Sequence, residues 1–131
     1  IRDRLDAGQS YNTWPKMGEK FFPEGLFFAE EKFMGIFDNS IFIHFFHRSL
    51  AYLCIAIILI ISILHFKKIK YVVQKIHFIS IISLVIIQVV IGIYVVLSNV
   101  QISLGSIHQI VGSLLFALTF SYFLLLNRRK I

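Results

Sequence analysis

Two histidines, His47 and His108, lie inside strongly apolar stretches of the sequence, in IHFFHRSLAY and SLGSIHQIVG. If membrane-spanning helices begin near Ile41 and Ile102, each histidine lies about 9 Å inside its helix at ~1.5 Å per residue. Ionisable side chains within spanning helices are costly and usually have a function. Two imidazoles that face each other at one depth could fill the two axial positions of a six-coordinate heme iron.

Small residues share a helix face with each histidine and would leave room for a flat ligand. The residues of these stripes are Gly105 and Gly112 on either side of His108, and Ala51 and Cys54 after His47. On the apolar stretch between them, Gly92 lies at a similar depth, and Gln88 lies one turn deeper. We therefore expect Gly92, Gly105 and Gly112 to line a cofactor site; the alternative is that the glycines only allow close helix packing.

Arg48 and His44 extend the candidate site. Arg48 points about 100° away from His47 around the helix, and no acidic residue lies in the three apolar stretches. Heme propionates could pair with its guanidinium; alternatively, the side chain snorkels to the outer headgroups. His44 could be an alternative ligand or an orienting hydrogen-bond donor. A histidine near a helix end can also be merely interfacial, and this interpretation suits His65 and His77, which border a basic segment.

The composition places these residues in a membrane protein. Of the 131 residues, 57% are hydrophobic and 15% are charged, and the mean hydropathy is +0.79. A soluble domain of this size could not bury so much apolar surface. The net charge of +6 does not indicate a nucleic-acid partner, because the basic residues border apolar stretches instead of forming a patch. The single cysteine excludes an intramolecular disulfide.

The apolar stretches predict an all-α membrane protein with three transmembrane helices, over about residues 41–66, 78–97 and 102–126. Residues 1–40 hold all seven acidic residues, and we expect them to form an outward-facing loop segment in which 26–37 could form a short interfacial helix. Residues 41–131 are then the membrane-embedded part. Basic residues in KKIKYVVQK and NRRK predict that these two segments face the cytoplasm or the mitochondrial matrix.

Several motifs follow one another along the chain in a specific order. They are DAGQSYNTWPKM (Asp6–Met17), FDN (Phe37–Asn39), HFFHRSLAY (His44–Tyr52), QVVIGIY, LSNV and SIHQIVGSLLF. In this combination the sequence closely resembles the C-terminal half of the heme A synthases of mitochondria and alphaproteobacteria. This family converts heme O to heme A by oxidising a ring methyl to a formyl group. The resemblance implies that His47 and His108 are the axial ligands of a heme b, with iron as the bound metal.

The family has eight spanning helices in two four-helix halves. By that resemblance, this chain would be an incomplete four-helix heme-binding bundle, without the first helix of its half and without the N-terminal half. His44 departs from the family, which usually has glutamine there. The absence of an initiator methionine also indicates that the sequence is part of a longer protein.

We therefore expect a part of a heme A synthase that supplies the heme b site and contains no catalytic residue itself. Its partners would be membrane lipid, the absent N-terminal half or a partner chain, and heme O as the substrate of the complete enzyme. The expected location is the bacterial inner membrane or the mitochondrial inner membrane. Two alternatives are a b-type cytochrome subunit that only transfers electrons and a structural membrane subunit without heme.

Overall fold

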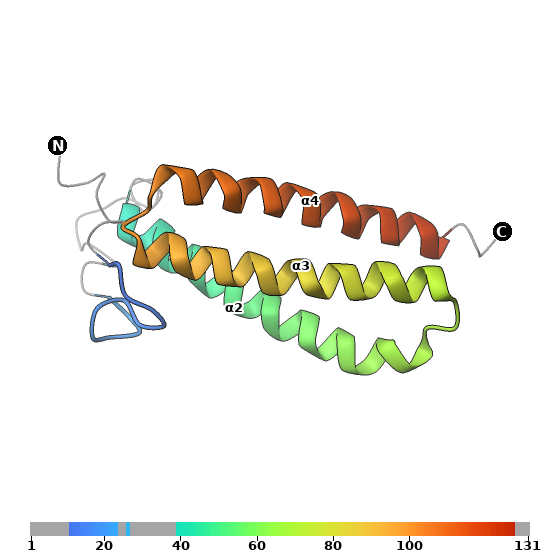
Figure 1. Cartoon of the computed structure of the whole chain (residues 1–131). Coiled ribbons are helices and arrows are strands. Elements are labelled where there is room, and N and C mark those ends of the chain that lie inside the picture. Colours follow the sequence, from blue (N-terminus) through green and yellow to red (C-terminus); the bar gives the residue numbers. More distant parts are fainter. Residues whose placement is uncertain (1–10, 24–25, 27–38, 128–131) are drawn as a thin grey trace.

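Three long helices and a loop segment at one end make up the computed structural model (Figure 1). The structure describes residues 11–23, 26 and 39–127. The helices are α2 (Ser40–His65), the short 3-10 helix η3 (Phe66–Lys68), α3 (Val72–Leu97) and α4 (Ile102–Asn127). The three long helices are each long and apolar enough to span a membrane, so among the described residues the predicted all-α class with three candidate membrane-spanning helices is confirmed. The predicted interfacial helix over 26–37 lies outside the described residues, apart from Leu26.

The second helix begins earlier than predicted, at Val72 instead of near Phe78. Lys75, which ends the predicted basic segment, and His77, which borders it, therefore lie in the first turns of α3. The prediction counted only the apolar stretch, whereas α3 has 26 residues and is about 39 Å long at ~1.5 Å per residue. A hydrocarbon layer is only ~30 Å thick, so a spanning helix of this length can continue past the layer with polar side chains.

Local sequence explains where the helices begin and turn. The side-chain oxygen of Asn39 accepts hydrogen bonds from the backbone N–H groups of Ile41 (3.0 Å) and Phe42 (3.3 Å), which caps the start of α2. Between α3 and α4, Asn99 and Val100 have positive φ angles of 54° and 57°. These two left-handed residues reverse the chain within four residues, so α3 and α4 lie side by side and antiparallel (Figure 1).

The helices pack unevenly. α3 and α4 form the tighter pair, and α2 approaches α3 closely at few positions. Phe78, Ile81 and Tyr122 form a buried cluster near η3, where Nε2 of His65 lies 3.2 Å from the hydroxyl of Tyr122. At the opposite end of the bundle, near segment 11–23, a cavity lies between the helices.

Candidate functional site

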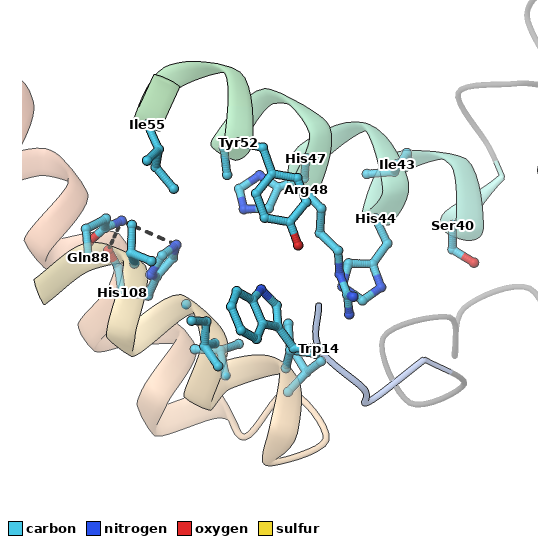
Figure 2. A pocket seen from close by; sticks show the side chains of 17 residues that line it. Trp14, Ser40, Ile43, His44, His47, Arg48, Tyr52, Ile55, Gln88 and His108 are labelled. Carbon is cyan, nitrogen blue, oxygen red and sulfur yellow. Dashed lines mark hydrogen bonds between the residues drawn. The ribbon is translucent and has the colours of Figure 1, made fainter. Parts of the chain in front are cut away.

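A cavity of about 570 Å³ lies between α2, α3 and α4, at the end that holds segment 11–23 (Figure 2). This volume is within the usual range of pockets that bind small molecules or cofactors. Most of its wall is apolar. Its nitrogen-bearing side chains are Trp14, His44, His47, Arg48, Gln88 and His108. The structure thus brings both candidate axial ligands, His44 and Arg48 to a single cavity.

His47 and His108 reach this cavity from different helices, α2 and α4 (Figure 2). Their ring centroids are 6.4 Å apart, and the ring planes make an angle of 76°. A metal ion lies about 2 Å from an imidazole nitrogen, so two imidazoles on opposite sides of one ion have centroids roughly 6 Å apart. Among the described residues, no three His, Cys, Asp or Glu side chains form a metal-binding group. The arrangement therefore offers a pair of imidazoles rather than a complete protein ligand set.

The backbone of α3 and the amide of Gln88 hold the ring of His108. A Cβ atom on Gly92 would lie 3.0 Å from Cε1 of His108, so glycine allows the imidazole to lie directly against α3. Nε2 of Gln88 donates to the backbone carbonyl of His108 (3.1 Å) and lies 3.3 Å from its Nε2. Nδ1 of His108 is buried without a hydrogen-bond partner among the described residues.

The three glycines of the candidate site have different surroundings. Gly92 lines the cavity, but Gly105 and Gly112 do not. A Cβ on Gly112 would lie 3.1 Å from Nε2 of Gln88, whereas a Cβ on Gly105 would meet nothing within 4 Å. Gly112 thus makes room for Gln88, and Gly105 has open space beside it; a role of either glycine in binding a cofactor stays a prediction.

Arg48 is 7% exposed, and its hydrogen-bond partners differ from those considered from the sequence. Its Nη1 donates to the carbonyls of Thr13 (2.8 Å) and Lys16 (3.2 Å), and its Nη2 donates to the carbonyl of Tyr11 (2.9 Å). Its Nε donates to Nε2 of His44 (3.2 Å). The sequence indicated only that Arg48 is a cation in an apolar stretch without an acidic partner. It could not indicate these acceptors, because every residue has a backbone carbonyl.

Segment 11–23 supplies one residue of the cavity wall that was not among the site residues expected from the sequence. Trp14 lines the cavity, and Figure 2 shows its indole between α2 and the other two helices. The hydroxyl of Tyr52 on α2 donates to the carbonyl of Pro15 (3.1 Å). Asn12 donates to the side-chain oxygen of Asn99 in the turn between α3 and α4 (2.9 Å). The segment is thus bonded to both sides of the cavity.

Known proteins resemble the chain over most of its length. Residues 3–120 match the COX15-CtaA family, described as cytochrome oxidase assembly protein. A heme A synthase of Pelagibacter ubique is 37% identical over 126 residues, which are 96% of this chain and 36% of the relative. One from Wolbachia pipientis is 34% identical over 96% of this chain and 34% of its own length.

A third heme A synthase, from Sinorhizobium medicae, is 36% identical over 80% of this chain and 29% of its own length. The chain therefore spans about a third of the length of these relatives. No solved structure shows a significant match. Because the family match extends over nearly the whole sequence and reaches into all three long helices, the chain belongs to the COX15-CtaA family of cytochrome oxidase assembly proteins.

Proposed function

We propose that this chain forms the heme b site of a heme A synthase, with His47 and His108 as the axial ligands. The observation that carries the proposal is the imidazole pair, which lines one cavity with ring centroids 6.4 Å apart. The family membership supports it, because relatives over this region are named heme A synthase. The complete enzyme would convert heme O to heme A in a bacterial or mitochondrial inner membrane.

The residues at the cavity fit a heme on three grounds. Imidazole nitrogens are good ligands for iron, and a porphyrin supplies the remaining four ligands that the described residues do not provide. The buried Nδ1 of His108 has no protein partner among the described residues. The wall is mostly apolar, as the edge of a porphyrin requires, and Gly92 allows close approach of the ring of His108 to α3.

The residues favour electron transfer over oxygen activation. When bound, heme b would accept and release one electron at a time. His47 and His108 would hold the iron from two sides, and a heme bound in this way would offer no position for oxygen or substrate. The apolar side chains of α2 and α3 exclude water and thereby influence the reduction potential. We therefore place oxidation of the heme O methyl group in the part of the enzyme outside this chain, which would be its partner.

Gly92→Ala tests whether close packing of His108 against α3 matters for cofactor binding. Because the added Cβ would lie 3.0 Å from Cε1 of His108, the ring must move by a few tenths of an ångström. We expect about tenfold weaker heme binding, in the range found when the support of a metal ligand is lost. Heme titration followed by absorbance of the purified protein measures this change.

Gly105→Ala is the matched control, because it adds the same methyl group on α4 where nothing lies within 4 Å. Its heme affinity should equal that of the unmodified protein. Equal affinities of the Gly92→Ala and Gly105→Ala proteins would contradict the proposed packing of the ligand.

A further inference from the structure

We propose that Arg48 is a positioning residue that holds segment 11–23 over the outward end of the cavity, so that Trp14 closes this end and retains the cofactor. The retention part rests on the proposed heme function. The part concerning the segment does not, because it follows from hydrogen bonds between Arg48 and the chain itself.

A single guanidinium binds three carbonyls of this short segment. Arg48 donates to the backbone oxygens of Tyr11, Thr13 and Lys16, at distances between 2.8 and 3.2 Å. A buried charge is tolerated only with good hydrogen-bond partners, and bonds from a cation are about twice as strong as neutral ones. The planar fork of arginine can reach several fixed acceptors at once, which a lysine ammonium group cannot reproduce.

The bonds to the segment flank Trp14. The carbonyl before it, on Thr13, accepts from Arg48, and the carbonyl after it, on Pro15, accepts from the hydroxyl of Tyr52. Both donors are on α2, one helical turn apart. The position of the Trp14 backbone is therefore fixed from both sides, with the indole in the cavity wall (Figure 2).

Further contacts make the segment a folded cap. Asn12 reaches across to Asn99 in the turn between α3 and α4 (2.9 Å), and the rings of Phe22 and Phe45 are 5.5 Å apart. Within the segment, the backbone N–H of Met17 donates to the carbonyl of Lys20 (2.9 Å). The cap thus spans from α2 to the far side of the cavity, and Arg48 supplies three of its bonds to α2.

This role differs from pairing with a heme propionate. The four hydrogen bonds of Arg48, three to the segment and one to His44, occupy four of the five N–H groups of a guanidinium. At most one N–H group is left for a carboxylate while the segment is held. The geometry therefore assigns the charge of Arg48 to the cap.

Limited trypsin digestion tests the cap without depending on heme. Lys16 and Lys20 are exposed cleavage sites within the segment. In the full-length enzyme in nanodiscs, Arg48→Lys should speed cleavage after these residues by roughly tenfold, since cleavage follows the population of the open segment and charge-assisted bonds are lost. Tyr52→Phe, which removes only the bond to Pro15, should give a smaller increase.

Ser49→Ala is the matched control on α2, because the hydroxyl of Ser49 bonds to the carbonyl of Phe45 in its own helix and to no other residue that the structure describes. This substitution should leave the rate of cleavage after Lys16 and Lys20 unchanged. Lys75 lies at the opposite end of the bundle, and the rate of cleavage after it should be the same in every variant. Equal cleavage after Lys16 and Lys20 in the Arg48→Lys and unmodified enzymes would overturn the proposal.

Heme transfer to excess apomyoglobin tests retention, with heme b and with its dimethyl ester. If the cap retains the cofactor, the Arg48→Lys and Trp14→Ala enzymes should both lose heme to apomyoglobin faster than the unmodified enzyme, whichever of the two hemes is bound. An Arg48→Lys effect that disappears with the ester would assign the residue to propionate binding and overturn the retention role. If the unmodified enzyme binds no heme, the heme function fails, and the digestion result still decides the cap.

Discussion

Replacing either His47 or His108 by alanine is expected to abolish stoichiometric low-spin heme in the purified protein. Each substitution removes one of the two imidazoles that line the cavity with centroids 6.4 Å apart. The iron would then have an open or water-filled axial position. We expect heme affinity to fall by more than about tenfold, because losing only the support of a ligand costs 10- to 100-fold. The pyridine hemochrome assay gives heme per protein, and the optical spectrum gives the spin state.

His77→Ala is the matched control, since His77 lies near the opposite end of α3 and bonds to the carbonyl of Val73 in its own helix. It should keep the full complement of low-spin heme. His44→Ala should also keep low-spin heme, because Nε2 of His44 is engaged by Arg48. Unchanged spectra in both His47→Ala and His108→Ala proteins would refute the ligand assignment, and loss only in His44→Ala would move the ligand by one turn.

Heme A formation is expected to require this chain together with the rest of the enzyme. In cells that make heme O, co-production of this chain and an N-terminal part of a related heme A synthase should yield heme A. His108→Ala in this chain should reduce the yield by at least about tenfold, because electron supply through the heme b site needs both axial ligands. Extraction of hemes followed by chromatography measures the product.

The control for this experiment is each part produced alone, for which we expect no heme A. Low-spin heme in this chain without any heme A from the combined parts would favour the electron-transfer cytochrome over the synthase. A full yield of heme A with the His108→Ala chain would contradict the assigned role of the heme b site.

The number of helices was predictable because apolar length and helix rise are fixed by the bilayer and by backbone geometry. The start of α3 was not, because Gln74, Lys75 and His77 interrupt the apolar pattern, although the helix continues through them. Counting residues from helix ends likewise gave similar depths for His47 and His108, and the structure places both rings at one cavity.

Which side chains of each helix face the cavity was harder to predict. Gly105 and Gly112 are within about 60° of His108 around α4, but the cavity wall is narrower than this arc, and neither glycine reaches it. The partners of Arg48 were also hidden in the sequence, because three backbone carbonyls of segment 11–23 satisfy it instead of a side chain. Contacts of this kind depend on how a loop folds back, which the apolar pattern does not encode.

Electron paramagnetic resonance of the ferric, heme-loaded protein examines the pair of axial imidazoles directly. The two ring planes make an angle of 76°. If the imidazoles kept this angle when they hold the iron, the two iron orbitals that interact with them would be nearly equal in energy, so we expect a strongly anisotropic low-spin signal. His108→Ala should convert it to a high-spin signal. A high-spin signal from the unmodified protein, or no bound heme at all, would contradict a heme b held by His47 and His108.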